Sequence, residues 1–297
     1  MLADKNVVAI DIGGTAIKSG MWNGRTLEEI KETETLAAQG GEALMERVKG
    51  IISSYGEGFD AIGISTAGEV NTNDGSIYYA NSNIPGYTGM PVKKIMEETF
   101  HVPTAVENDV NAAALGELRA GAAKGCNDFL CLTYGTGVGG SIVIDGKIYS
   151  GASFSAGSFG GIVIHPEEKK GTDSLEGCYE RCASTTGLVK RAKTVDASLD
   201  NGRKIFAAKD RPEVKIQIDA WIDDICTGLV TITTIFNPSR IILGGGVMAQ
   251  EYVLSEVNRR VKEQIAPGLR KVEIVPAKLA NTAGMIGAVS LAEKLLA

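Results

Sequence analysis

One pattern occurs twice in this chain, and it constrains the fold more than any other feature of the sequence. Residues 7–24 and residues 129–146 each run from an apolar strand-like segment through a glycine turn into a second strand and an Asx-Gly hairpin signal. In both copies eleven positions separate the first turn glycine from the hairpin glycine. These glycines are Gly13 and Gly24 in the first copy, and Gly135 and Gly146 in the second. The repeat predicts an internal duplication into two related lobes, more readily than a chance likeness of two hairpins.

Elsewhere in the chain, apolar strand-like runs alternate with segments of helical spacing, which favours a layered α/β fold. The expected strands outside the repeat cover residues 61–65, 104–106, 235–243 and 272–276. The expected helices cover residues 41–55, 92–100, 111–123, 253–265 and 283–296.

Length and charge narrow the classes of protein that fit. The chain has 297 residues, which is too long for one comfortable hydrophobic core and suits two lobes. Its formal net charge of -6 argues against nucleic acid as the main partner. The N-terminal segment lacks a signal-peptide pattern, and no apolar run reaches the roughly 20 residues that span a bilayer. A cytoplasmic protein with no membrane partner and with free cysteine thiols is therefore expected.

Three glycine turns are candidates for binding a nucleotide, because backbone N–H groups without bulky side chains can approach a phosphate closely. The candidate residues are Gly13, Gly14, Thr15 and Lys18 in the first turn, Gly135, Thr136 and Gly137 in the second, and Gly244, Gly245 and Gly246 in the third. Asp11 precedes the first turn, where it could hold Mg²⁺ directly or through water. A plain hairpin is the alternative for any single turn, but three turns are more specific than one.

Two common classes of nucleotide-binding protein fit poorly. The chain contains no Walker sequence ending in Gly-Lys-Ser/Thr, and no dinucleotide fingerprint stands in order. A P-loop NTPase and a Rossmann dehydrogenase are therefore not expected.

Taken together, the motifs resemble the ROK family of sugar kinases and repressors, within the sugar kinase, actin and Hsp70-like ATPase superfamily. The matching segments are residues 11–18, 107–114, 135–140 and 244–247, and in order and spacing they cover nearly the whole chain. The resemblance implies two ribonuclease-H-like (actin-like ATPase) lobes with a cleft between them, ATP and Mg²⁺ as cofactors, a small-molecule sugar substrate and a homodimer. It also implies that the last helix packs on the first lobe. The expected lobes are residues 1–117 with 283–297, and residues 118–282.

Asp109 matches the general base of this family, and Asn108 matches a ligand of the sugar hydroxyls. The chemistry agrees, because a carboxylate within hydrogen-bond reach can accept the proton of a sugar hydroxyl during phosphoryl transfer. A helix N-cap is the alternative role for Asp109, and both roles can hold at once. Further sugar-binding candidates, by the same resemblance, are Asn83, Ser158 and Glu180. The alternative for Asn83 is a residue that only forms a turn, and the alternative for Glu180 is a solvated residue of a helix.

The chain departs from the family pattern at the sugar site. Where most members carry Ala-Gly-Glu-x-Gly-His, Ser158 stands in place of the Glu and Gly161 in place of the His. Both replacements are smaller, so the pocket near the anomeric end of the sugar is expected to be wider and poorer in hydrogen bonds. That space would suit a sugar with a bulky β-linked group.

The zinc motif of the family is also broken. Gly171 and Asp173 occupy two of its cysteine positions, and Cys178 alone cannot supply a closed four-ligand site. Cys182 could share a helix face with Cys178, but no third and fourth ligands are evident in a chain with two histidines. No structural zinc is therefore expected.

The sequence predicts an ATP-dependent kinase that phosphorylates a hexose hydroxyl, with the 6-hydroxyl of a β-glucoside such as cellobiose as the acceptor. An N-acetylmannosamine kinase and a glucose kinase are the alternatives within the same class. A non-catalytic, sugar-sensing or regulatory ROK protein is the alternative of another class. Family repressors carry a DNA-binding domain before the first glycine turn, and only ten residues precede Asp11, so no repressor is expected.

Overall fold

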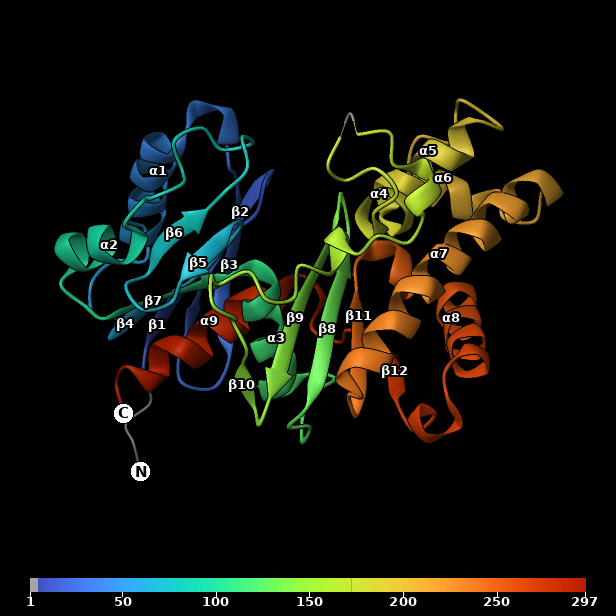
Figure 1. The fold of residues 1–297 in the computed structure, drawn as a ribbon. Coiled ribbons are helices and arrows are strands. Elements are labelled where there is room, and N and C mark those ends of the chain that lie inside the picture. The colour runs from blue at the N-terminus through green and yellow to red at the C-terminus, as the bar shows by residue number, and fades with distance from the viewer. Residues whose placement is uncertain (1–4, 172) are drawn as a thin grey trace. The chain divides into compact units, whose positions relative to one another are not determined.

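The computed structural model describes residues 5–171 and 173–297, which divide into two units (Figure 1). Unit 1 contains the chain up to residue 125 with residues 148–156 and 281–297, and unit 2 contains residues 126–147 and 157–280. Residues 1–4, with which the expected first lobe begins, lie outside the described residues.

The units differ from the expected lobes mainly in two segments, residues 118–125 and 148–156, which belong to unit 1. Residues 118–125 stay with unit 1 because they fold back onto the preceding helix: the Ala122 N–H donates to the Glu117 carboxylate at 2.6 Å. Residues 148–156 carry Phe154, whose ring contacts Tyr78 of unit 1 edge to face.

A five-stranded mixed sheet with strand order β3-β2-β1-β4-β7 forms the centre of unit 1. The first three strands form an antiparallel meander, and β4 and β7 continue the sheet parallel to β1. These strands are β1 (Val7–Ile12), β2 (Ala16–Trp22), β3 (Leu27–Glu34), β4 (Ala61–Thr66) and β7 (Thr104–Asn108), and a separate hairpin contains β5 (Glu69–Asn71) and β6 (Ser76–Tyr79).

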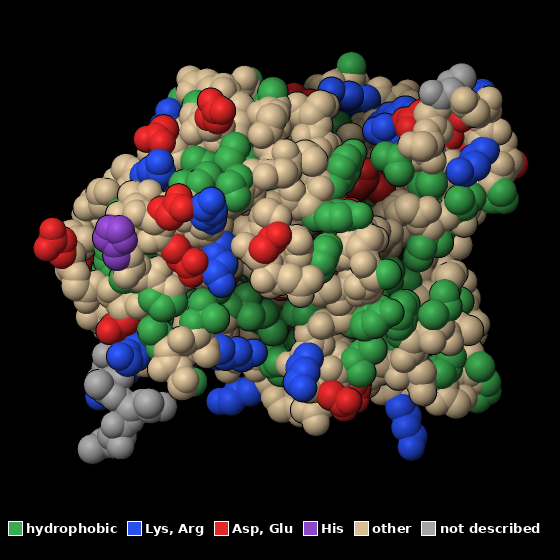
Figure 2. Space-filling model, turned by 60° about the vertical axis from the view of Figure 1, so that its left-hand side comes forward, with side chains coloured by type: hydrophobic (Ala, Val, Ile, Leu, Met, Phe, Trp, Pro, Cys, Tyr) green, Lys and Arg blue, Asp and Glu red, His purple; other side chains and the backbone are tan. Residues whose placement is uncertain are grey.

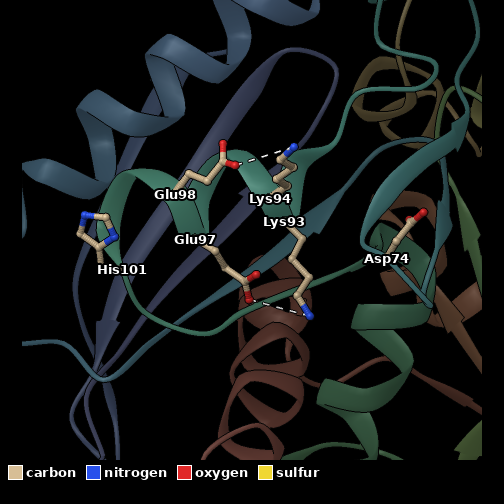
Figure 3. Close-up of a pocket in the computed structure, with 6 residues that line it drawn as sticks. All are labelled: Asp74, Lys93, Lys94, Glu97, Glu98 and His101. Carbon is tan, nitrogen blue, oxygen red and sulfur yellow. Dashed lines mark ion pairs between the residues drawn. The ribbon is translucent and has the colours of Figure 1, made fainter.

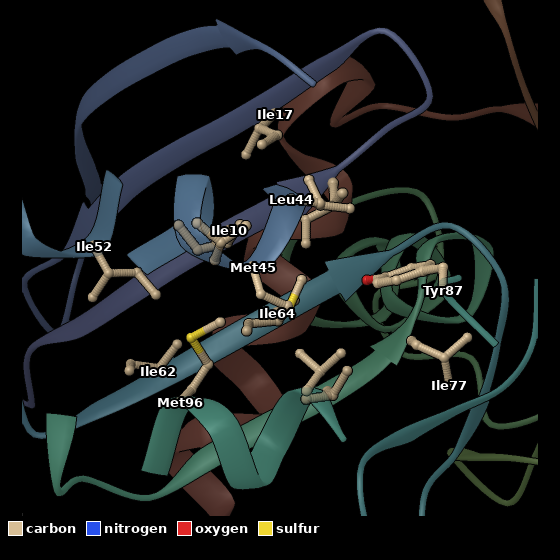
Figure 4. Close-up of a cluster of buried hydrophobic side chains, with 14 of the residues drawn as sticks. Ile10, Ile17, Leu44, Met45, Ile52, Ile62, Ile64, Ile77, Tyr87 and Met96 are labelled. Atoms are coloured by element: carbon tan, nitrogen blue, oxygen red, sulfur yellow. The ribbon is translucent and has the colours of Figure 1, made fainter. Parts of the chain in front are cut away.

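Helices cover both faces of this sheet, so β1 is buried along nearly its whole length. They are α1 (Gly41–Ser53), α2 (Val92–Phe100), α3 (Asp109–Ala120) and α9 (Ala283–Lys294). Side chains alternate between the faces of a strand. Val8 and Ile10 therefore join the core under α1 and α2, which is shown in Figure 4, whereas Val7 and Ala9 pack against α9.

Helix α9 comes from the end of the chain and lies against both β4 and α3. Its approach is close because glycines line the contact. A Cβ atom on Gly287 would collide with the Ala112 carbonyl of α3, and one on Gly116 would collide with the Ala283 carbonyl. No side chain fits at either position, so glycine allows the two helix backbones to touch.

Unit 2 repeats the architecture with a sheet of order β10-β9-β8-β11-β12. Its strands are β8 (Phe129–Tyr134), β9 (Val138–Ile144), β10 (Lys147–Ile148), β11 (Arg240–Gly244) and β12 (Glu273–Pro276). Its helices are α4 (Tyr179–Ala183), α5 (Thr185–Lys193), α6 (Gly202–Ala207), α7 (Pro212–Phe236) and α8 (Glu251–Gln264). β8 pairs antiparallel with β9 and parallel with β11, as β1 does with β2 and β4. The common strand order agrees with the predicted duplication, and the α/β class is confirmed.

Short 3-10 turns complete the described elements at η1 (Ala37–Gln39), η2 (Phe159–Gly161), η3 (Pro166–Glu168), η4 (Gly246–Ala249), η5 (Pro267–Leu269) and η6 (Ala280–Thr282). Among the described residues, no helix combines the length and the apolar character needed to cross a membrane.

One predicted element is wrong in its extent. The strand expected over residues 235–243 begins only at Arg240, because residues up to Phe236 end the 25-residue helix α7. Asn237 terminates that helix in a left-handed conformation, and Pro238 cannot continue it. The apolar run on either side of these two residues therefore belongs to two elements.

Candidate functional site

Polar side chains of unit 1 gather where its parallel strands end. Asp11 on β1, Ser65 on β4 and Glu107 on β7 are neighbours in the register of the sheet. The Ser65 hydroxyl donates to Asp11 Oδ1 at 2.7 Å. Gly284, at the start of α9, lies so close to this pair that a Cβ atom there would be 2.8 Å from Asp11 Oδ1. The carboxyl ends of parallel strands are the usual place for a ligand site in α/β folds.

The first glycine turn follows directly from Asp11. The Gly13 N–H donates to the Ala16 carbonyl at 3.0 Å, and Thr35 closes the turn from the side, with its hydroxyl donating to the Gly13 carbonyl at 2.7 Å. Gly14 and Thr15 are exposed, and a Cβ atom on Gly14 would meet nothing within 4 Å. The turn therefore offers open backbone, as a phosphate would require. No local sequence pattern predicts a role for Thr35 or Ser65, because the fold brings them to Gly13 and Asp11 from distant segments.

Asp109 is the first residue of α3, and it is partly exposed. The helix N-cap is Asn108, whose Oδ1 accepts from the Val110 and Asn111 N–H groups at 3.0 and 3.1 Å. The alternative that Asp109 is the N-cap is therefore wrong by one residue. The side chain of Asn108 also donates to Gly68 O and to Asp109 Oδ1, both at 2.9 Å, so it holds the Asp109 carboxylate in place. Its sugar-binding role stays a prediction.

The carboxyl groups of Asp109 and Asp11 influence each other. Burial, and after it the nearby charge of Asp11, raise the pKa of Asp109 to about 6, although hydrogen bonds from Val110 and Asn108 act in the opposite direction. Burial also raises the pKa of Asp11, against the opposing effects of the Ser65 hydrogen bond and the Lys18 charge. Lys18 lies opposite Asp11 in the β1–β2 ladder. The repulsion between two ionised carboxyl groups would be relieved by a bound cation.

Unit 2 positions the second glycine turn between β8 and β9. The Gly135 N–H donates to Gly137 O at 3.0 Å, and both Gly135 and Thr136 are exposed. Glu180 of α4 lies against the turn and accepts from the Val138 N–H at 3.1 Å. A Cβ atom on Gly137 would collide with the Glu180 carboxylate. The predicted sugar ligand Glu180 therefore shapes this turn.

The third glycine turn adjoins the second. Gly244 ends β11 next to Thr133 of β8, and a Cβ atom on Gly245 would collide with the Tyr134 carbonyl. Gly245 also has a φ of 107°, which disfavours any other residue. The structure thus brings two of the predicted turns together at one edge of the unit 2 sheet.

The N-terminus of α5 supports the second turn. Ser184 caps this helix by accepting from the Gly187 N–H, and the Thr185 N–H donates to Gly135 O at 3.0 Å. The Thr186 hydroxyl donates to Thr136 O at 2.8 Å. A cavity of about 440 Å³ opens beside these residues and is lined by Thr136, Thr186, Lys190, Arg181, Glu180 and neighbouring residues.

The other sequence candidates are exposed residues. Asn83 is exposed in a turn, where its backbone N–H donates to Asn81 Oδ1. Ser158 and Gly161 are exposed, and a Cβ atom on Gly161 would meet nothing within 4 Å. The residues at the family's zinc positions do not fit that metal, because Cys178 is the one thiol among them and its Sγ lies 3.7 Å from Ser174 O.

A second depression, of about 510 Å³, lies on α2 of unit 1 and carries no comparable chemistry. Figure 3 shows that its charged side chains pair along the helix, Lys93 with Glu97 at 3.8 Å and Lys94 with Glu98 at 3.7 Å. Figure 2 likewise shows basic side chains beside acidic ones on one face of the molecule. Pairs of this kind are usual on a solvated surface.

Comparison with known proteins decides the family. The ROK family pattern matches residues 7–295. This chain belongs to the ROK family. A β-glucoside kinase of Listeria monocytogenes is 32% identical over 95% of this chain and 96% of its own length.

Solved structures of ROK proteins share the fold along nearly the whole chain. A ROK family glucokinase of Streptomyces griseus, in complex with glucose and AMPPNP, has a TM-score of 0.82 and 29% identity, covering 97% of this chain and 99% of that one. A Listeria monocytogenes protein provisionally assigned as an N-acetylmannosamine kinase has a TM-score of 0.89 and 28% identity, covering 98% and 100%. The expected fold, two lobes of the actin-like ATPase type, is confirmed.

Proposed function

We propose that this ROK protein is an ATP-dependent sugar kinase that transfers the γ-phosphoryl group to a hexose hydroxyl, with Asp109 as the general base. The observation that carries the proposal is the carboxyl group of Asp109, which is partly exposed, fixed by Asn108 and has a pKa of about 6. A base with such a pKa is mostly ionised at neutral pH and still accepts a proton readily. Relatives named glucokinase and β-glucoside kinase support the same activity.

In the proposed reaction, one Asp109 oxygen accepts the proton of the sugar hydroxyl while the hydroxyl oxygen forms a bond to the γ-phosphorus. The bond from that phosphorus to the β-phosphate oxygen breaks, and ADP leaves with the electron pair. Asn108 keeps the carboxylate oriented, because its amide donates to Asp109 Oδ1. The exposed backbone of the glycine turns would bind the phosphates.

Asp11 is the proposed Mg²⁺ residue. It is partly exposed, follows a strand end and has the Asp109 carboxyl group nearby, so a cation there would relieve the repulsion between the two groups. When bound, Mg²⁺ would neutralise phosphate charge during transfer. Turnover should require Mg²⁺, and Asp11→Asn should raise the Mg²⁺ concentration that gives half-maximal rate.

The preferred acceptor is proposed to be a β-glucoside such as cellobiose. Ser158 and Gly161 are small and exposed, so they leave room where most family members carry Glu and His. Values of kcat/KM for cellobiose, aryl-β-glucosides, glucose and N-acetylmannosamine decide the question. The proposal fails if glucose or N-acetylmannosamine is the best of these substrates. Restoring the family residues, in the double variant Ser158→Glu with Gly161→His, should shift preference toward free glucose.

A non-catalytic sugar-binding role is the rival of another class, and ADP release over a panel of hexoses, amino sugars and β-linked disaccharides separates the two. No sugar-dependent ADP release from a folded protein that binds sugar would favour the rival. The expectations of a homodimer and of no nucleic-acid partner stay predictions, which sedimentation and a DNA-binding assay can check.

Substitutions at two glycine positions, Gly135 and Gly137, test the nucleotide turn. Gly135→Ala should leave the fold unchanged, since a Cβ atom there meets nothing within 4 Å, yet it should raise the KM for ATP if phosphate uses that space. Gly137→Ala, and more severely Gly137→Val, should also displace Glu180 and lower stability. Gly268→Ala, which likewise meets nothing, is the matched control. Unchanged ATP affinity in both turn variants would reduce this turn to a plain hairpin.

A further inference from the structure

Three side chains with metal-binding groups meet in unit 2, away from the glycine turns. They are His165 in the segment after β10, Cys182 on α4 and Asp224 on α7. One ligand atom from each lies within 4.8 Å of the other two. His165 Nε2 and Asp224 Oδ1 are 2.7 Å apart. Cys182 and Asp224 are buried, with 6% and 5% of their surface exposed, and His165 is partly exposed.

The next shell of contacts orients these ligands as in many metal sites. Glu167 Oε1 lies 3.0 Å from His165 Nδ1, so it can accept a hydrogen bond from a protonated Nδ1. Nε2, which faces Asp224 Oδ1, is then the nitrogen that would bind a metal once it gives up that contact. Arg191 donates to Oδ2 of Asp224, the oxygen opposite the one that faces the histidine. A carboxylate on the far nitrogen of a ligating histidine and a hydrogen bond to a ligating carboxylate are the usual outer partners of a bound metal.

Charge balance favours a divalent cation at this place. The negative charges of a Cys182 thiolate and of the Asp224 carboxylate together neutralise the two positive charges of the metal. Among the residues that contact these ligands, the negative charge of Glu167 neutralises the positive charge of Arg191. Without a metal, Asp224 is still paired with His165 and Arg191. These ion pairs would by themselves account for the positions of His165 and Asp224. That ion-pair network gives no role to the buried thiol beside it.

We propose that His165, Cys182 and Asp224 bind a thiophilic divalent transition metal, with Zn²⁺ as the best match and water as the fourth ligand. One sulfur, one imidazole nitrogen and one carboxylate oxygen suit Zn²⁺ better than Mg²⁺ or Ca²⁺, which prefer oxygen ligands. Binding displaces the Cys182 thiol proton to solvent.

This site differs from the broken zinc motif of the family, since none of its three ligands occupies a motif position. It also revises the expectation of a zinc-free chain, which rested on the lack of further ligands in the sequence. The metal would connect three segments, the η3 region, α4 and α7, and α4 carries Glu180 under the second glycine turn. The inference does not depend on kinase activity.

The test is a titration of chelator-treated full-length protein with Co²⁺ and with Zn²⁺. One equivalent of Co²⁺ should bind and give sulfur-to-cobalt charge-transfer absorption, and Zn²⁺ should displace it and raise the thermal midpoint. Cys182→Ala should remove the charge-transfer band. The control is Cys178→Ala, which changes another buried cysteine about one helical turn away and should keep the band. Glu167→Gln, which retains all three ligands, should weaken Zn²⁺ binding by about 10- to 100-fold.

Each contrary outcome overturns the proposal. No stoichiometric Co²⁺ or Zn²⁺ binding to the folded parent protein would leave the ion-pair network as the whole explanation. A band that survives in Cys182→Ala but disappears in Cys178→Ala would place the metal at the remnant of the family motif. If the Cys182 variant fails to fold, Asp224→Asn provides a second test with a different readout. Loss of the carboxylate ligand should weaken Co²⁺ binding, while the sulfur band persists at saturating Co²⁺; unchanged Co²⁺ affinity in this variant would overturn the proposal.

Discussion

Asp109 combines two properties at the scale of a single residue: it begins a helix, and its carboxyl group is desolvated beside a second carboxyl group. Asn108, and not Asp109, caps α3, so the Asp109 carboxyl group stays available for a ligand. An aspartate at this position can therefore be changed without removing the N-cap.

Asp109→Asn should keep the fold and lose the proton acceptor, which lowers kcat by on the order of 10²- to 10⁴-fold. In the parent protein, kcat/KM should fall as pH drops through about 6, where Asp109 becomes protonated. Steady-state rates on the best substrate measure both effects. Asp210→Asn, the same change at an exposed residue, should have no effect. Near-parental turnover of Asp109→Asn would remove this residue from the mechanism.

The raised pKa also predicts how stability depends on pH. Folded Asp109 holds its proton up to about pH 6, whereas the ordinary value is 3.8, so the folded state binds more protons between these values. This group therefore makes stability fall as pH rises through that window, and the cost persists at higher pH. Asp109→Asn should melt at a higher temperature than the parent above about pH 7, and the difference should shrink below about pH 4. Equal midpoints throughout would show that the carboxylate is well solvated.

At the scale of elements, the contact between α3 and α9 depends on glycine more than on side-chain packing. Gly287→Ala should destabilise the protein by about 2 kcal/mol or more, because the added Cβ collides with backbone of α3. The same substitution at Gly50, in α1, meets nothing within 4 Å and should stabilise by about 0.5–1 kcal/mol. Denaturant unfolding of the two variants measures both signs. Equal effects would mean that α9 can shift to accommodate a methyl group.

Local patterns predicted most elements, since the apolar runs of β1, β4 and β7 and the spacing in α1 and α2 depend on neighbours in the chain. They gave no helix between residues 123 and 253, where α4 to α7 lie, and they failed where two elements shared one apolar run, as at Asn237 between α7 and β11. The residues of the candidate site likewise fall into those that the sequence predicted and those that it did not. The glycine turns and Asp109 were visible in the sequence, whereas Thr35 on the first turn and the His165 cluster depend on contacts between distant segments, which no local pattern contains.

At the scale of the whole molecule, the two tryptophans of the chain report separately on the two units. Trp22 lies in unit 1, where its Nε1–H donates to Glu293 of α9 at 2.8 Å, and Trp221 is fully buried in unit 2. Fluorescence of the variants Trp22→Phe and Trp221→Phe therefore follows each unit by itself.

Deletion of residues 281–297 should expose Trp22, because it removes α9 and with it the Glu293 partner and the cover over Val7 and Ala9. The expected result is a red-shifted Trp22 signal with no unfolding transition, together with a Trp221 signal that stays buried. Iodide quenching provides a second measure of exposure. A native-like Trp22 signal in the shortened chain would show that the sheet of unit 1 folds without its last helix.

The return of α9 has a consequence for biosynthesis. A ribosome that has released residues up to 280 has produced all of unit 2 but only part of unit 1, although most of unit 1 precedes unit 2 in the sequence. During translation, one apolar face of the sheet formed by residues 7–108 lacks its cover from α9 until residues 281–297 emerge. Unit 1 is thus begun before unit 2 and completed after it, and the surroundings of Asp11 and Gly284 form only after residues 281–297 have been made.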